Sequence, residues 1–163
     1  MGREIRMVPA NWNHPARITD RGEIQFVPLF DGSFSDRDKQ YALDKEKWGR
    51  GEFPDWADEE SKKLSFEEWE GQAPSADDYM PEWKGEEKTH LMMYENTSEG
   101  TPISPAFATP EELARWLADT GASSFGSSTA TYDQWLATCK KGWAVSAVFT
   151  PDTGLISGVE FNK

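Results

Sequence analysis

The stretch Thr-His-Leu-Met-Met-Tyr-Glu-Asn, residues 89–96, does most to decide the fold class of this chain. Residues 90–94 form a largely apolar run of strand length, and a segment rich in turn-forming residues follows and ends at Pro105. An apolar strand of this kind is typical of the interior of a sheet, where it pairs with a strand on each side. We therefore predict a central strand at residues 90–96.

Two helices are predicted on the C-terminal side of this strand. The first begins at Thr109, where Thr-Pro-Glu-Glu places a cap, a first-turn proline and a capping-box glutamate in the right order. Its two leucines and its tryptophan fall on one face, and Gly121 ends it. The range 131–141 repeats this pattern, with a Thr and Gln capping box, two lysines in the last turn and Gly142 as the stop.

The C-terminal segment is typical of a β-hairpin. Two strands, 144–149 and 155–161, flank a turn that contains proline and glycine where a hairpin loop requires them. Near the N-terminus, strands are predicted at 4–8 and 23–29, and the proline at position 28 limits the second to a sheet edge or an irregular end. The sequence therefore predicts an α+β fold in a single domain, 1–163, with a small antiparallel sheet and a C-terminal β-hairpin packed by two or more α-helices.

The acidic residues are concentrated in the middle of the chain. Residues 31–88 contain 18 acidic and 9 basic side chains, which accounts for −9 of the total formal charge of −12. Within this segment we predict a helix at 35–48 and one or two short helices between residues 55 and 69. The segment also contains four of the eight tryptophans, at positions 48, 56, 69 and 83.

Composition and charge exclude several classes of function. A net charge of −12 repels phosphate backbones, which argues against direct nucleic-acid binding, whereas it steers the chain toward a basic surface. No apolar run approaches the roughly 20 residues of a membrane-spanning helix, so we expect no membrane partner. The lone cysteine cannot form an intramolecular disulfide and no signal peptide is recognised, so we expect a cytoplasmic protein.

The sequence contains no motif that indicates catalysis or metal binding. Cys139 lies at the C-terminal end of its predicted helix, where the helix dipole opposes a thiolate. The two histidines, His14 and His90, are too far apart for a diagnostic metal-binding pattern. We expect no cofactor, no metal and no enzymatic activity. An enzyme of unknown class is kept as the third alternative, with a site that would bring His14 or His90 together with Glu99.

Two motifs resemble a known group of proteins. Residues 8–15, Val-Pro-Ala-Asn-Trp-Asn-His-Pro, and residues 94–105, Tyr-Glu-Asn-Thr-Ser-Glu-Gly-Thr-Pro-Ile-Ser-Pro, together with the helix that follows, resemble small proteins encoded by tailed phages and prophages. The segment 142–146 fits the same pattern. The resemblance implies a bacterial host cytoplasm and a role against host systems. It supplies no catalytic residues.

A candidate binding surface lies in the acidic middle, with one further residue in the turn after the central strand. On helical faces its carboxylates would lie about 5 to 6 Å apart, which is close to the spacing of phosphates along a nucleic-acid strand. Such a surface could occupy the basic cleft of a nucleic-acid-binding protein, and the alternative is a solvated acidic surface that only aids solubility. The tryptophans at 48, 56, 69 and 83 could also form a stacking platform. The candidate residues are Asp55, Trp56, Asp58, Glu59, Glu60, Glu67, Glu68, Trp69 and Glu99.

These observations favour a phage-type accessory protein that acts by protein–protein binding. Its predicted partner is a host or phage protein with a basic surface, such as a nucleic-acid-handling or defence protein that it inhibits. The alternative is a structural or assembly component of the phage particle. The sequence does not specify an oligomeric state.

Overall fold

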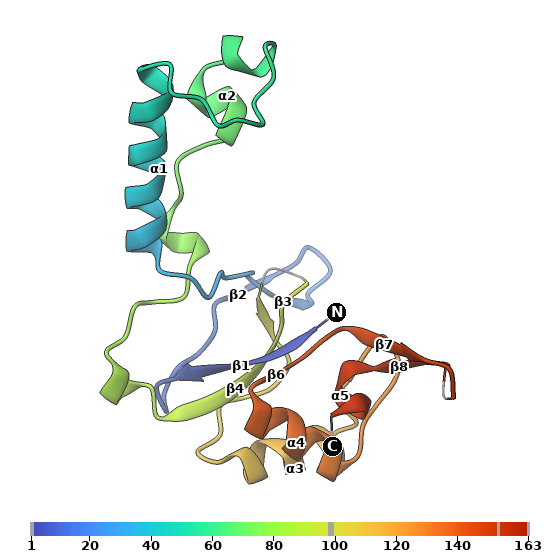
Figure 1. The fold of residues 1–163 in the computed structure, drawn as a ribbon. Helices are drawn as coiled ribbons and strands as arrows, with labels where there is room; N and C mark the ends of the chain where they lie inside the picture. Colours follow the sequence, from blue (N-terminus) through green and yellow to red (C-terminus); the bar gives the residue numbers. More distant parts are fainter. Residues whose placement is uncertain (1, 98–99, 153, 163) are drawn as a thin grey trace. The chain divides into compact units, whose positions relative to one another are not determined.

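The computed structural model describes residues 2–97, 100–152 and 154–162, and the chain divides into two compact units. One unit comprises residues 1–29 together with 83–163, and the other comprises residues 30–82. The predicted α+β class is confirmed, with an antiparallel sheet, packed helices and a C-terminal β-hairpin (Figure 1). The single domain expected over the whole chain stays a prediction.

The first unit is built on a four-stranded antiparallel sheet with the strand order β5-β4-β1-β6. Strand β4 (His90–Glu95) is an interior strand, as predicted, because it pairs with β1 (Arg3–Val8) along its whole length and with β5 (Thr101–Pro102) at its end. Strand β6 (Trp143–Ala144) pairs with the start of β1 and extends the sheet on the other side. The apolar run that singled out residues 90–94 is therefore covered by neighbours on both edges.

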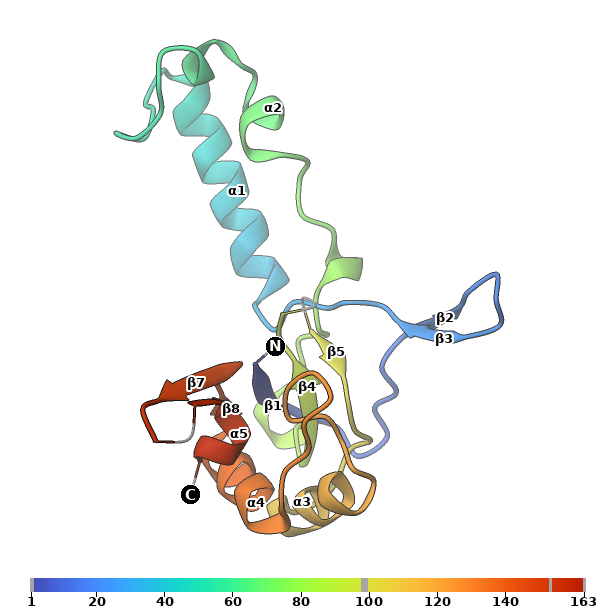
Figure 2. The same ribbon diagram turned by 90° about the vertical axis from the view of Figure 1, so that its right-hand side faces the viewer.

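The hydrophobic core of this unit lies between the sheet and two helices, α3 (Pro110–Asp119) and α4 (Tyr132–Lys141), which cover one face of the sheet (Figures 1 and 2). Both predicted helices are confirmed, and each begins with the reciprocal capping box that its sequence indicates. Gly142 ends α4 in the left-handed region at φ 91°. The buried core residues are Met93, Leu113, Ala114, Leu117, Trp135, Cys139, Ala144 and Val159.

The opposite face of the sheet carries a buried polar cluster. The Arg6 guanidinium lies 4.4 Å from the centre of the Tyr94 ring and donates a hydrogen bond of 2.6 Å to the carbonyl of Leu29. Gly100 closes this cluster with φ 95°, and a Cβ atom there would come within 2.1 Å of the Leu29 carbonyl oxygen. Glycine at position 100 is therefore required by its backbone conformation and by the close approach of its neighbours.

Two predicted C-terminal strands differ from the structure. The range 144–149 is divided between β6 in the main sheet and β7 (Ala147–Thr150), which forms the hairpin with β8 (Gly154–Ser157). The end of the predicted strand 155–161 is wrong, because Gly158–Phe161 forms a short helix, α5. The Ser157 side chain accepts a hydrogen bond from the Glu160 amide, and this capping box starts a helix where the hairpin turn before it suggested a continuous strand.

The predicted strand at 23–29 is shortened to β3 (Ile24–Phe26). It pairs with β2 (Ala16–Ile18) in a separate two-stranded hairpin. Pro28 has no amide hydrogen and cannot extend the ladder, which agrees with the limit expected from the sequence. The short 3-10 turn η3 (Gly85–Glu87) precedes β4 in the first unit.

The second unit consists of one long helix and short helical turns. Helix α1 (Phe34–Gly49) exceeds the predicted range 35–48 by one residue at each end and begins at the Ser33 cap. The short helices expected between residues 55 and 69 correspond to the 3-10 turn η1 (Ser61–Lys63) and helix α2 (Phe66–Glu70). A further 3-10 turn, η2 (Ala76–Asp78), lies near the end of the unit.

Candidate functional site

The excess negative charge of the chain belongs to the second unit. Residues 30–82 contain 16 acidic and 7 basic side chains, a net charge of −9, whereas the first unit contains 13 acidic and 10 basic side chains, a net charge of −3. Charges in a unit of this composition create a negative field that favours cations and basic partners. The candidate site is therefore built from the residues of this unit.

Aromatic rings hold α1 against the segment that carries α2. The Tyr41 ring lies edge-on to the Phe66 ring with 5.0 Å between centroids, and the Tyr41 hydroxyl donates to the Gly71 carbonyl at 2.9 Å. Further along α1, Trp48 stacks on Trp69 at 5.2 Å, and its indole N–H donates to the Leu64 carbonyl at 3.1 Å. These contacts replace the aliphatic packing that the segment lacks.

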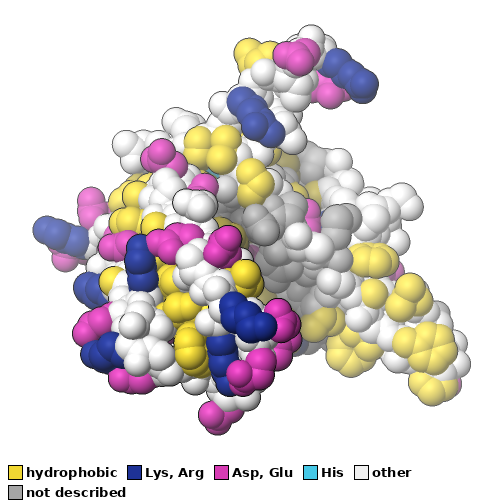
Figure 3. Space-filling model, turned by 90° about the horizontal axis from the view of Figure 1, so that it is seen from above, with side chains coloured by type: hydrophobic (Ala, Val, Ile, Leu, Met, Phe, Trp, Pro, Cys, Tyr) yellow, Lys and Arg dark blue, Asp and Glu magenta, His cyan; other side chains and the backbone are white. Residues whose placement is uncertain are grey.

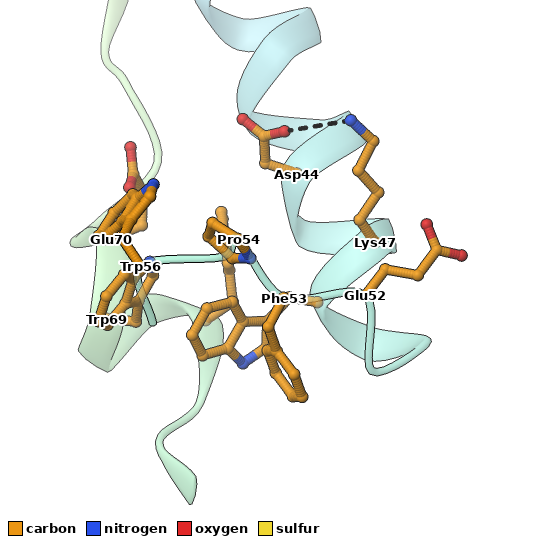
Figure 4. A pocket seen from close by; sticks show the side chains of 10 residues that line it. Asp44, Lys47, Glu52, Phe53, Pro54, Trp56, Trp69 and Glu70 are labelled. Atoms are coloured by element: carbon orange, nitrogen blue, oxygen red, sulfur yellow. Dashed lines mark ion pairs between the residues drawn. The ribbon is translucent and has the colours of Figure 1, made fainter. Parts of the chain in front are cut away.

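A pocket of about 500 Å³ opens beside this aromatic cluster. Trp56 lies 4.9 Å from Trp69 on one side of the pocket, yet 74% of its surface is exposed to solvent. Figure 4 shows Trp56 and Trp69 together on one side, Asp44 and Lys47 projecting from α1 on the other, and Pro54 between them. The lining residues are Asp44, Lys47, Trp48, Glu52, Phe53, Pro54, Trp56, Phe66, Trp69 and Glu70.

The two predicted tryptophans line the pocket, whereas none of the predicted carboxylates that the structure describes does so. Asp58 accepts a hydrogen bond of 2.7 Å from the Ser61 amide, and its hydrogen bonds to Ser61 lower its pKa. Glu59 and Glu60 are each paired with the lysine three residues later, at 2.6 and 2.5 Å. Asp55 is exposed and lies outside the pocket lining.

The remaining predicted residues support α2 or lie outside the described structure. Glu67 forms an ion pair with Lys45 of α1, and this hydrogen bond lowers the pKa of Glu67. Glu68 belongs to the capping box of α2, where the Ser65 amide donates to it at 2.8 Å and lowers its pKa. Glu99 is outside the described residues.

Acidic and basic side chains are mixed on the face of the molecule that Figure 3 shows. Figure 3 shows Asp and Glu side chains next to Lys and Arg side chains, with hydrophobic side chains between them. The pairs Glu59–Lys62 and Glu60–Lys63 show the same mixing within the predicted site. Because these lysines partly neutralise the neighbouring carboxylates, the predicted row of carboxylates is a weak basis for binding a partner. The tryptophan pocket is a better candidate because it has a defined shape.

Sequence reasoning did not assign several pocket residues to the site. Asp44 and Trp48 come from α1, and Glu52 and Phe53 follow the turn after it. Their grouping with Trp69 depends on how the chain folds back from α1 to α2. The feature of the sequence that could have indicated this pocket was the number of tryptophans in residues 31–88. Of the four tryptophans weighed as a platform, three line the pocket, and Trp83 instead contacts Trp12 in the first unit at 4.8 Å.

A second pocket of about 530 Å³, in the first unit, is lined by residues of both segments 8–15 and 94–105. His14 lies at this pocket and is buried. Its Nε2 atom donates to the Val27 carbonyl at 2.6 Å, so its Nδ1 atom accepts from the Tyr94 hydroxyl at 3.1 Å. Burial is the main factor that lowers the pKa of His14. Both ring nitrogens of His14 are thus used within the protein.

The two histidines line different pockets. His90 lines a different hollow, together with Trp116 of α3, and its Nδ1 atom lies 2.9 Å from the Thr89 hydroxyl. The pocket at His14 has no carboxylate among the described residues that line it. Because Glu99 lies outside the described residues, the catalytic grouping that would include it stays a prediction.

Cys139 lies in the core near the C-terminal end of α4, as expected. Burial raises the pKa of its thiol to about 12, which disfavours the thiolate needed for nucleophilic chemistry. Within residues 2–97, 100–152 and 154–162, no three His, Cys, Asp or Glu side chains are grouped to hold a metal ion. Over the same ranges, no helix combines the length and the apolar character needed to cross a membrane.

Comparison with known proteins does not place this chain in a family. It matches no family model, no curated protein and no solved structure.

Proposed function

We propose that residues 30–82 form a binding surface for a partner protein with a basic surface, and that the protein is a phage-type accessory factor that inhibits or redirects a host protein. The observation that carries this proposal is the tryptophan pocket, which opens within the unit that holds −9 of the net charge. A pocket formed by large rings supplies contact area, and the surrounding charge supplies attraction at long range.

The charge favours a protein partner over a nucleic acid. An acidic unit repels phosphates, and at physiological salt its field extends about 8 Å before it is screened. A basic protein is attracted by the same field and associates faster. Proteins that handle nucleic acids carry such basic surfaces, which makes them the class of host partner that this unit fits.

The exposure of Trp56 supports contact by this surface. Most of its indole faces solvent, although burying a tryptophan is among the largest hydrophobic gains available to a side chain. Aromatic side chains of this kind dominate the binding energy of protein interfaces. Covering Trp56 with a partner would therefore add a large favourable contribution to binding.

The test is a comparison of wild-type and Trp56→Ala proteins as bait in a lysate of bacterial host cells, followed by association kinetics with the purified partner. We expect wild type to retain a basic protein that the variant loses. The association rate should fall several-fold as salt rises from about 50 to about 300 mM. Association at a rate independent of salt would contradict the electrostatic part of the proposal.

A structural or assembly role in a phage particle is the second candidate, and exposed apolar pairs favour it. In the β2–β3 hairpin, Ile18 lies opposite Ile24, and they are 77% and 74% exposed. In the β7–β8 hairpin, Phe149 lies opposite Leu155, and they are 75% and 66% exposed. Such pairs would be covered in an assembled particle. Mass spectrometry of purified virions distinguishes the two candidates, because only a particle component is present there in stoichiometric amounts.

A further inference from the structure

We propose that the tryptophan pocket of residues 30–82 binds an arginine side chain of the partner, which stacks on Trp56 and hydrogen-bonds to the carboxylates at the rim. This inference rests on the proposed function and gives it a specific chemistry.

The walls of the pocket suit a planar cation. Trp69 is the central ring, since it contacts Trp48 at 5.2 Å with an interplanar angle of 26° and Trp56 at 4.9 Å with an angle of 31°. Trp48 is therefore stacked on Trp69, Trp56 is tilted against Trp69 by 31°, and the Trp56 indole is largely open to solvent. The face of an indole carries negative charge density and attracts a cation that lies over it.

The rim of the pocket has a negative balance of charge. Three carboxylates, from Asp44, Glu52 and Glu70, face a single basic side chain, Lys47, in the lining. Each carboxylate already has a cation nearby, with closest N–O distances of 3.8, 2.9 and 2.5 Å respectively. These pairs are exposed to solvent and each contributes little, about 0 to 1 kcal/mol. A carboxylate also has about four acceptor positions, so each of these carboxylates can accept hydrogen bonds from a second cation while keeping its present partner.

No cation of the described chain occupies the faces of the pocket tryptophans. Among the described residues, no lysine or arginine lies over the ring of Trp48, Trp56 or Trp69. The contact of this kind at a lining residue is at Phe53, where the Nζ atom of Lys62, itself outside the lining, is 6.0 Å from the ring centre. Elsewhere the chain does form this contact. The closest cases are Arg115 over Tyr132, at 3.9 Å, and Arg6 over Tyr94, at 4.4 Å.

A guanidinium fits the pocket better than an ammonium group. It is planar, so it can lie flat on Trp56 while its edge donates two parallel hydrogen bonds to one carboxylate, and it is more weakly hydrated. A lysine ammonium is a point charge with a tightly held water shell, which it would have to lose against the rings. An uncharged side chain would leave the rim carboxylates without a new partner.

The experiment uses the whole 163-residue chain and three capped peptides, Ac-Gly-Xaa-Gly-NH2, in which Xaa is arginine, lysine or citrulline. Citrulline keeps the shape of arginine and removes its charge. Binding is followed by NMR through the tryptophan indole N–H signals, with that of Trp56 assigned from the Trp56→Leu variant. We expect saturable shifts for the arginine peptide, binding about threefold weaker or more for lysine, and no saturable shift for citrulline.

Three variants locate the binding. Trp56→Leu should weaken the arginine peptide about fivefold or more, and Glu52→Gln should weaken it about twofold and reduce its salt dependence. Trp143→Leu is the matched control, because Trp143 is half exposed and belongs to the other unit. It should leave the affinity unchanged. Circular dichroism checks that each variant is folded.

Equal binding of the arginine and citrulline peptides would overturn the inference, and so would an unchanged affinity in Trp56→Leu. Failure of the proposed function gives a different result. If Trp56→Leu abolishes peptide binding while a basic partner still associates in a salt-dependent way at the wild-type rate, the pocket binds arginine and the partner is bound elsewhere. If the partner depends on Trp56 but the peptides do not discriminate, the surface functions without an arginine site.

Discussion

At the scale of single residues, Cys139 shows how burial changes chemistry. Its raised pKa of about 12 results mainly from burial, with a further contribution from Glu111. The sequence indicated an unfavourable position at a helix C-terminus, and the structure adds the hydrophobic core as the larger reason. Both factors disfavour the thiolate.

This pKa predicts a loss of stability at high pH. The thiol of the unfolded chain ionises near its ordinary value of about 8.5 to 9, whereas the folded thiol keeps its proton until about pH 12. Above pH 9 the folded state therefore binds more protons, and the free energy of unfolding falls by up to about 1.4 kcal/mol per pH unit from this group. Urea unfolding between pH 7 and pH 11, compared with Cys139→Ala, measures it. Parallel pH profiles for the two proteins would contradict the prediction.

Gly100 marks the limit of sequence reasoning at this scale. A turn was evident from the residues around position 100, but any turn glycine would give that signal. The structure shows why no other residue fits, since the Leu29 carbonyl and the Arg6 guanidinium occupy the space beside its Cα atom. That constraint involves residues 71 and 94 positions away in the chain, so no local pattern could reveal it.

At the scale of elements, helix starts were the features most accurately predicted. The capping boxes at Thr109 and Thr131 depend on a side chain and an amide three residues apart, and both form as expected. The same chemistry at Ser157 went unrecognised because the hairpin turn before it favoured one continuous strand over residues 155–161. A helix of four residues gives too little periodicity to be recognised beside a hairpin turn.

The cap of α3 gives a prediction at this scale. Thr109→Ala removes the oxygen that accepts from the Glu112 amide at 3.2 Å, and we expect the free energy of unfolding to fall by about 1 kcal/mol. Thr109→Ser keeps that oxygen and should recover most of the loss. Denaturant unfolding of the three proteins measures the effect. If serine and alanine destabilise equally, the hydroxyl does not act as a cap.

At the scale of the whole molecule, the division into two units is the main result. Charge already separated the middle segment from the rest of the sequence, and the second unit, residues 30–82, lies almost entirely within the predicted acidic segment 31–88. Each unit has its own packing. The first has an aliphatic and aromatic core around Trp135, and the second relies on rings such as Tyr41 and Phe66.

Separate packing predicts separate responses to mutation. Phe66 is 6% exposed and contacts the rings of Tyr41 and Trp48, so Phe66→Ala should destabilise the second unit by about 3 to 5 kcal/mol. Hydrogen exchange should show lost protection in α1 and unchanged protection in β4. Phe149→Ala, at a position 75% exposed, is the control and should leave both unchanged. Equal loss of protection in α1 and β4 would show that the two units unfold together.

The sequence by itself determined the α+β class, the central strand at β4, the helices α1, α3 and α4, and the location of the acidity. These features depend on periodicity, caps and composition, which are local. Only the tertiary structure decided that residues 143–150 are divided between two sheets and that Asp44, Trp56 and Trp69 meet at one pocket. The physical reason is that pairing partners and pocket walls are set by contacts between segments distant in sequence, and local patterns do not encode which segments meet.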